Sequence, residues 1–159
     1  MGSVLKHFPG YGNNVDTHTG IALDQRPLEQ FLAEDLLPFR AGAQTGAGAV
    51  LVSHNIITCL DETLPASLSY AAYALLREEV GFDGVAMTDD LDMDAVAAYV
   101  EEGSAVVQAI SAGADMVLTS DPEGQIRQVL NALREGRLDW ERVQNGAERQ
   151  ACGDSRKGP

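Results

Sequence analysis

The sequence has little basic charge and no long hydrophobic run. Lysine and arginine total 11 against 24 aspartates and glutamates, which gives a net charge of −13 at pH 7. Such a surface repels a phosphate backbone, so nucleic acid and anionic membranes are not expected as partners. No apolar run approaches the roughly 20 residues that span a bilayer, and the first residues lack the charged and then apolar pattern of a secretory signal. We therefore expect no membrane segment and, by default, a cytoplasmic location.

Cysteine is also scarce. Cys59 and Cys152 lie far apart and show no metal-ligand spacing, and two cysteines do not make a disulfide framework. We expect two free thiols. Apolar residues make up 45% of the 159 residues, which suits a single domain with a buried core.

A stretch near the start gathers chemically useful side chains. Residues 6–18 read Lys-His-Phe-Pro-Gly-Tyr-Gly-Asn-Asn-Val-Asp-Thr-His. Proline fixes φ and glycine permits positive φ, so the stretch predicts a shaped loop rather than a helix or strand. Asp16 and His18 stand two apart, so an extended backbone places both on one face. Asp16 can then accept the Nδ1 proton of His18 and leave Nε2 for proton transfer. The alternative is a polar surface loop without a catalytic role.

Apolar runs alternate with helical patterns along the rest of the chain. This alternation requires parallel strands and predicts an α/β fold. A complete (β/α)8 TIM barrel takes about 250 residues, so a chain with about four βα units is expected to form part of one. The predicted strands are a stub at residues 4–5 and runs at 49–52, 85–87 and 116–118. The predicted helices are 27 to about 42, 67 or 69 to 80, about 94–112, 122–134 and 139–150, with residues 151–159 as a disordered tail. Gly81 is the predicted stop of the second helix, and Asp121 is the predicted N-cap of the fourth. Helical spacing relates Phe31, Leu36 and Phe39 in the first helix and Val96 and Val106 in the third.

Polar residues follow the predicted strands where α/β folds place their active sites. Asp89 comes directly after one apolar strand, and His54 ends another. Each has a structural alternative: Asp89 can cap the following turn, and His54 can be a buried, hydrogen-bonded histidine. The aspartates at positions 90, 92 and 94 suggest a calcium loop, but Ala95 occupies the sixth place, where the sharp turn needs glycine. No metal site is predicted.

Three segments carry a resemblance to a known family. Lys-His-Phe-Pro-Gly at residues 6–10 resembles a signature of family 3 glycoside hydrolases, in the branch that contains bacterial β-N-acetylhexosaminidases. Gly-Phe-Asp-Gly-Val-Ala-Met-Thr-Asp-Asp-Leu-Asp-Met at residues 81–93 resembles the segment with that family's nucleophile. Residues 52–54 and 65–69 are similar to the strand and loop between them. The resemblance covers about residues 4–138 and implies a catalytic domain over residues 1–150 that contains only the second half of the barrel.

The resemblance implies retaining hydrolysis of terminal β-N-acetylglucosaminides, as in cell-wall muropeptides and peptidoglycan turnover. Asp89 would be the nucleophile, and His18, oriented by Asp16, the general acid and base. The partner would be a small carbohydrate, and neither a metal nor an organic cofactor is required. The substrate-binding residues that the resemblance implies are Lys6, His7 and His54, of which His54 lines the pocket or supports Asp89.

Several alternatives remain open. A neutral imidazole does not repel phosphate, so phosphorolysis is compatible with the same residues. Tyr11 stands where the family commonly has histidine, and the loop to Asp16 is one residue shorter than its commonest form. The chain also lacks the half-barrel that supplies other sugar-binding residues in the family. The alternative to an active enzyme is a truncated, catalytically inactive half-barrel that acts as a sugar-binding or non-functional fragment. Exposed barrel edges also predict self-association of the chain.

Overall fold

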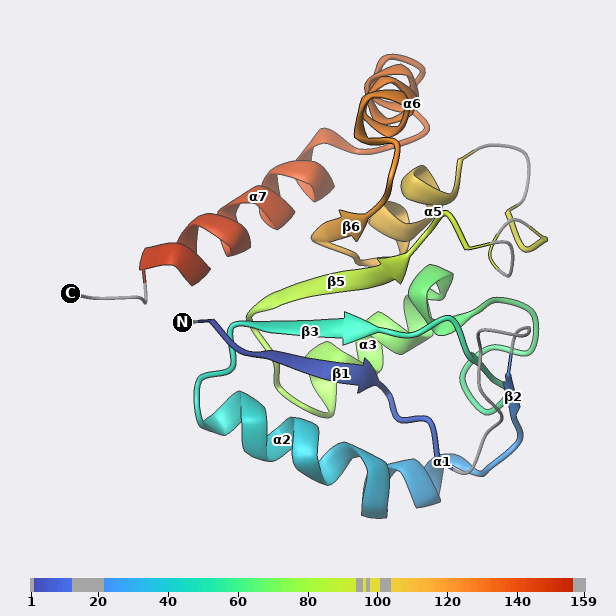
Figure 1. Ribbon diagram of the computed structural model, residues 1–159, viewed down its shortest axis with the longest axis vertical. Coiled ribbons are helices and arrows are strands. Elements are labelled where there is room, and N and C mark those ends of the chain that lie inside the picture. Colours follow the sequence, from blue (N-terminus) through green and yellow to red (C-terminus); the bar gives the residue numbers. More distant parts are fainter. Residues whose placement is uncertain (1, 13–21, 94–95, 97, 101–103, 156–159) are drawn as a thin grey trace.

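A computed structural model of the chain describes residues 2–12, 22–93, 96, 98–100 and 104–155. Its centre is a four-stranded sheet in the order β1-β3-β5-β6, in which every neighbouring pair is parallel (Figure 1). The predicted α/β architecture is confirmed, and the arrangement is consistent with part of a (β/α)8 barrel. The strands are β1 (Val4–Phe8), β3 (Ala49–Val52), β5 (Val85–Asp90) and β6 (Met116–Leu118).

Helices cover the sheet and bury its middle strands. Val50, Val52 and Ala86 are fully buried, whereas Leu51 and Met87 on the opposite face are only half-buried. The helices therefore bury one face of the sheet more completely than the other, which differs from the equal burial of both faces that continuous apolar runs predict. In Figure 1, α2 lies alongside β1, α3 lies behind the sheet, and α5 lies next to β6. The bounds of these helices are α2 (Leu36–Gln44), α3 (Tyr70–Glu78) and α5 (Ala105–Ala112).

The first helical segment has three successive parts: α1 (Leu28–Gln30), a π-helical turn (Phe31–Asp35) and α2. Phe31, Leu36 and Phe39 are buried, as their helical spacing predicted. Phe39 also packs edge-on against Phe8 of β1, with ring centroids 5.1 Å apart. Pro38 has no N–H to donate to a preceding carbonyl, and the wider π turn lies just before it.

Local sequence signals set the ends of α3 and α6. A 3-10 turn (Ala66–Leu68) precedes α3, and Gly81, with φ of +69°, follows it as the predicted stop. Helix α6 spans Pro122–Arg134. The Asp121 carboxylate accepts the backbone N–H of Gly124 at 3.0 Å, which is the predicted N-cap.

The long helix predicted over residues 94–112 is wrong. Helix α5 begins only at Ala105, and Ser104 before it has extended backbone angles, φ −130° and ψ 129°. Val96 and Val106 are both buried in the core. Their spacing therefore does not come from one continuous helix: two separate segments pack against the same core, because burial is set by tertiary contact.

Two further boundaries differ from those predicted. β1 continues beyond the stub at residues 4–5 through the first part of the motif, because its Phe8 pairs with Val52 of β3. Helix α7 (Trp140–Ser155) passes the predicted end at Gln150. The Gln150 side chain donates to the Asp115 carbonyl at 2.6 Å, which holds that part of the helix against the strand β6. Residues 151–155 of the predicted tail are thus helical, and 156–159 lie outside the described residues.

A second, two-stranded parallel sheet was not predicted. It pairs β2 (Leu23–Asp24) with β4 (Ile56–Ile57). Pairs this short carry no periodicity that a sequence pattern can reveal. Among the described residues, none of the helices combines the length and apolar character needed to cross a bilayer.

Candidate functional site

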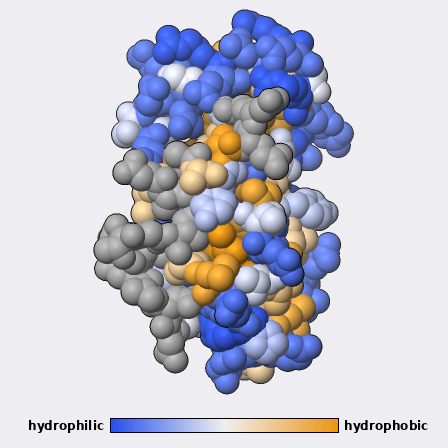
Figure 2. All heavy atoms as spheres, turned by 90° about the vertical axis from the view of Figure 1, so that its right-hand side faces the viewer, coloured by the Kyte–Doolittle hydropathy of each residue, from blue (hydrophilic) through white to orange (hydrophobic). Residues whose placement is uncertain are grey.

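The carboxyl ends of the four strands of the main sheet face the same side of the molecule, to the right in Figure 1. Figure 2 looks onto this side and shows a band of apolar surface between two hydrophilic ends. Because parallel strands end together, the polar residues at their ends are brought to one region.

Asp89 is the penultimate residue of strand β5 and does not lie beyond the strand. The strand extends through Asp90, because Asp90 pairs with Leu118 of β6. This corrects the expectation that the apolar run ends the strand before Asp89. The Asp89 carboxylate is half-buried, and its Oδ1 accepts the backbone N–H of Asp90 at 3.0 Å. One carboxylate oxygen is therefore oriented by the backbone at the open end of the sheet.

His7 lies within the electrostatic reach of Asp89. Burial lowers the pKa of His7 below its ordinary value, the Asp89 charge opposes that shift, and Lys6 adds to it. The His7 ring meets the Tyr11 ring edge-on, with centroids 5.0 Å apart and an interplanar angle of 86°. Lys6 is exposed and His7 is half-buried. The structure thus brings the end of β1 and the end of β5 together, as the parallel arrangement predicted.

His54 has both ring nitrogens engaged. Its side chain is 2% exposed, with Nε2 2.9 Å from the Asp90 carbonyl oxygen and Nδ1 2.7 Å from Ser67 Oγ. A carbonyl only accepts, so Nε2 carries the proton and the Ser67 hydroxyl donates to Nδ1. Burial lowers the pKa of His54, against smaller opposing effects of the Asp90 hydrogen bond and the charges of Asp89 and Asp90. This geometry favours support of the Asp89 strand end over direct contact with a ligand.

An ion-pair network that sequence reasoning missed lies beside the glycine-containing loop. Arg26 donates to Asp24 and Asp35, each at 2.8 Å, and its guanidinium lies 4.3 Å from the Phe31 ring centroid. Asp24 is almost fully buried. A Cβ added to Gly12 would lie 2.5 Å from the Arg26 guanidinium, so the network packs directly against that loop. Only the folded chain brings these residues together, and no spacing signal predicted it.

Asn55 was also missed. It is fully buried directly after His54, and neither polar atom of its side chain has a hydrogen-bond partner among the described residues. The only signal for Asn55 in the sequence is its position directly after His54. Asp16 and His18 lie outside the described residues, so their predicted pairing stays a prediction.

No group of three or more histidine, cysteine, aspartate or glutamate side chains in the described part of the chain is arranged to hold a metal ion. Cys59 and Cys152 are both exposed, and neither forms a disulfide.

These features define an α/β chain with a carboxylate at the open end of a parallel sheet. Residues 1–151 match the glycosyl hydrolase family 3 N-terminal domain, and the chain belongs to this family. The predicted resemblance is confirmed.

Relatives and solved structures agree with this assignment. A β-hexosaminidase of Xanthomonas campestris is 41% identical over 127 residues, which cover 77% of this chain and 38% of the relative. A family 3 β-N-acetylglucosaminidase from Paenibacillus sp. is 31% identical, with a TM-score of 0.89 over 98% of this chain and 31% of that one. A family 3 glycosyl hydrolase from Mycobacterium smegmatis is 35% identical, with a TM-score of 0.85 over 98% of this chain and 50% of that one. The chain thus spans half or less of the length of each of these three proteins.

Proposed function

We propose that this chain carries the nucleophile and acid–base part of a retaining β-N-acetylhexosaminidase. The observation that carries the proposal is the position of Asp89, half-buried at the carboxyl end of β5 in a member of glycosyl hydrolase family 3. A retaining glycosidase needs an ionised carboxylate that attacks the anomeric carbon and a separate proton donor for the leaving group.

The reaction proceeds in two displacements. The Asp89 carboxylate attacks the anomeric carbon as His18, oriented by Asp16, gives its proton to the glycosidic oxygen, which leaves as an alcohol. A glycosyl ester on Asp89 results. His18, now neutral, takes a proton from water, and the hydroxide oxygen replaces the ester oxygen and restores the configuration. The backbone N–H of Asp90 keeps one Asp89 oxygen in a hydrogen bond, so the carboxylate enters the reaction already oriented.

The substrate is a terminal β-N-acetylglucosaminide of the cell-wall muropeptide type. Support comes from the similarity of this chain to a β-hexosaminidase and a β-N-acetylglucosaminidase. Lys6 and His7 of β1 donate to sugar hydroxyls, because both carry N–H groups and His7 lies within the electrostatic reach of Asp89. His54 acts indirectly, because its Nε2–H donates to the Asp90 carbonyl and so positions the backbone next to Asp89.

An inactive, sugar-binding fragment is the second candidate. Within the described residues, the main sheet has four strands, and no strand pairs with the outer edges of β1 and β6. A mouth bounded by four strands offers a sugar fewer contacts than a closed barrel.

Turnover of a chromogenic β-N-acetylglucosaminide by the purified chain separates these candidates. We expect free N-acetylglucosamine as the product with or without added phosphate, and no release by an Asp89→Asn variant. If a sugar 1-phosphate formed, and only when phosphate was present, the reaction would be phosphorolysis and not hydrolysis. Saturable binding of N-acetylglucosamine without any turnover would favour the inactive fragment.

A further inference from the structure

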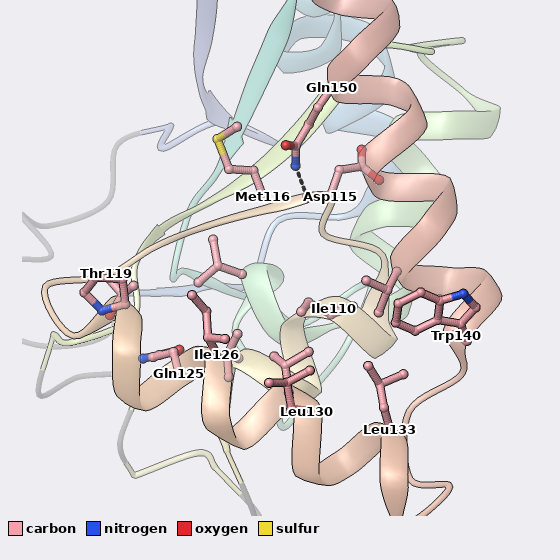
Figure 3. Close-up of a pocket in the computed structure, with 15 residues that line it drawn as sticks. Ile110, Asp115, Met116, Thr119, Gln125, Ile126, Leu130, Leu133, Trp140 and Gln150 are labelled. Atoms are coloured by element: carbon pink, nitrogen blue, oxygen red, sulfur yellow. Dashed lines mark hydrogen bonds between the residues drawn. The ribbon is translucent and has the colours of Figure 1, made fainter.

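The Asp92 carboxylate joins two loops at the carboxyl end of the main sheet. Asp92 lies in the turn after β5, and its Oδ2 accepts the Thr119 hydroxyl at 3.0 Å and the Ser120 hydroxyl at 2.6 Å. The backbone N–H of Ser120 donates to the same oxygen. Figure 3 shows Thr119 where the chain passes from β6 into α6. One carboxylate oxygen thus connects the turn after β5 to the loop after β6.

The bridge is charge-assisted, although Asp92 is exposed. Hydrogen bonds from the side chain and the backbone of Ser120 hold the pKa of Asp92 below its ordinary value, so the carboxylate is ionised at neutral pH. Hydrogen bonds to an ionised acceptor are roughly twice as strong as those between neutral groups. The N-cap of α6 does not need Asp92, because Asp121 already accepts the N–H of Gly124 at 3.0 Å. The contacts of Asp92 therefore hold the loop rather than cap that helix.

The turn that contains Asp92 leads directly to Asp89. The backbone N–H of Asp92 donates to Oδ1 of Asp90 at 3.0 Å, and the backbone N–H of Asp90 donates to Oδ1 of Asp89 at 3.0 Å. Each contact orients the next group along the chain. The loop after β6 is therefore linked through Asp92 and Asp90 to the half-buried carboxylate of Asp89.

The end of β5 depends on side-chain contacts of this kind. The register of the β5–β6 pair shifts between Met87 and Asp90, so a regular ladder of backbone hydrogen bonds does not continue to the strand end. On the side of β3, the His54 ring donates to the Asp90 carbonyl at 2.9 Å. Asp92 supplies the corresponding side-chain contact on the side of β6, so the strand end is held from both neighbouring strands.

We propose that Asp92 is a positioning residue for the reaction of Asp89. Its carboxylate holds the turn after β5 against the loop after β6, and Asp90 transmits this restraint to the Asp89 carboxylate. This inference rests on the proposed function, in which Asp89 attacks the anomeric carbon. A displacement of about 1 Å in a reacting group can lower the rate about 10²-fold. Because Asp92 acts through Asp90 and not on the sugar, its loss should lower kcat much more than it changes KM.

Steady-state kinetics on the full chain test this role. Asp92→Ala should lower kcat for a chromogenic β-N-acetylglucosaminide by about tenfold and leave KM within about twofold, whereas Asp92→Asn, which keeps one acceptor oxygen, should lose less. The matched control is Asp139→Ala, because Asp139 is also exposed and accepts a local N–H, from Glu141 at 2.9 Å. Thermal melts show that each variant is folded. A change in KM alone, or equal losses of kcat in Asp92→Ala and Asp139→Ala, would overturn the proposal.

NMR spectroscopy tests the same link without catalysis. The amide proton of Asp90 donates to Asp89 and therefore reports the position of that carboxylate. Ser120→Ala removes one donor to Asp92, and we expect it to shift this resonance in the wild type but not in an Asp92→Ala background. A shift of equal size in both backgrounds, or none in either, would contradict the proposal. If the link is present but the wild type releases no sugar, the proposed activity fails while the positioning of Asp89 by Asp92 stands.

Discussion

The buried ring of His54 holds the backbone of Asp90 through a hydrogen bond of 2.9 Å from Nε2 to the Asp90 carbonyl oxygen. Asp90 in turn gives its own N–H to the Asp89 carboxylate at 3.0 Å. A histidine at the end of β3 is thereby linked through one residue to the proposed nucleophile at the end of β5. The order of the proposed site thus depends on a group that does not itself need to touch the substrate.

Removal of the Asp89 carboxylate should abolish turnover. In Asp89→Asn, the amide cannot form the glycosyl ester, so the rate should fall by several orders of magnitude while the fold is kept. The measurement is kcat for a chromogenic β-N-acetylglucosaminide. The matched control is Asp90→Asn, because Asp90 is the neighbouring carboxylate on the same strand. A near-normal rate in Asp89→Asn with loss in Asp90→Asn would move the nucleophile by one residue.

His18 and Asp16 should act as one unit. If Asp16 orients His18, then Asp16→Ala, His18→Ala and the double variant should lose similar amounts of kcat, because groups that act together are not additive. The check is a double-mutant cycle under single-turnover conditions. Losses in log kcat that sum in the double variant would show that the two residues work independently.

Acid should destabilise the fold partly through His54. Burial places the pKa of His54 below its ordinary value of about 6.5 in the folded chain. The unfolded chain then binds the proton more tightly, so the free energy of unfolding falls as pH drops below about 6.5 and levels off below the folded pKa. Chemical denaturation from pH 8 to 5 should show this slope and a flatter profile for His54→Gln.

His7→Gln is the comparison for that titration, since burial also lowers the pKa of His7. We expect the His7 substitution to remove less of the slope, because His7 is only half-buried whereas His54 is 2% exposed. Parallel pH profiles for the wild type and His54→Gln would show that His54 does not contribute.

Loss of the Asp115 carboxylate should release helix α7. The Asp115 side chain is fully buried and pairs with Arg77, Arg142 and Arg149 at 2.6, 3.1 and 3.2 Å, which joins α3 and α7 to the start of β6. Breaking a buried ion pair lowers the free energy of unfolding by about 3–5 kcal/mol. We expect a loss near the lower value for Asp115→Asn, because the three arginines are partly exposed to solvent. Urea denaturation and amide exchange in α7 measure the effect.

The surface pair of Glu135 with Arg137 provides the control for Asp115. Both side chains are about half exposed, and exposed pairs contribute roughly 0–1 kcal/mol. Glu135→Gln should therefore shift the urea midpoint only slightly. Equal shifts in the two variants would mean that the Asp115 cluster does not carry the attachment of α7.

Gly10 should tolerate no side chain. Its φ is +131°, and a Cβ there would overlap the Asp35 side chain that pairs with Arg26. Gly81 has φ of +69° and open space around it, so Gly81→Ala tests backbone strain alone, about 1–2 kcal/mol. Gly10→Ala should be clearly more destabilising in thermal melts, and equal losses in the two variants would contradict a role of the contact with Asp35.

Local patterns were sufficient for most of the framework. The apolar runs of β3 and β5, the N-cap at Asp121 and the stop at Gly81 depend on residues close in sequence, so they were predicted correctly. The end of α7 and the start of α5 were not, because Gln150 is held by Asp115 and Ser104 breaks a periodicity that two separate segments share. Those boundaries depend on partners far along the chain.

The sequence by itself determined which groups can reach the open end of the sheet: alternating strands and helices force parallel strands, and residues at their carboxyl ends, such as Asp89 and His7, share that end. Only the tertiary structure decided what each group does there. It turned His54 into a buried support whose ring nitrogens are both engaged, and it placed Arg26 against Gly12. Burial and hydrogen-bond partners come from segments distant in the chain, and no periodicity or spacing within one segment contains them.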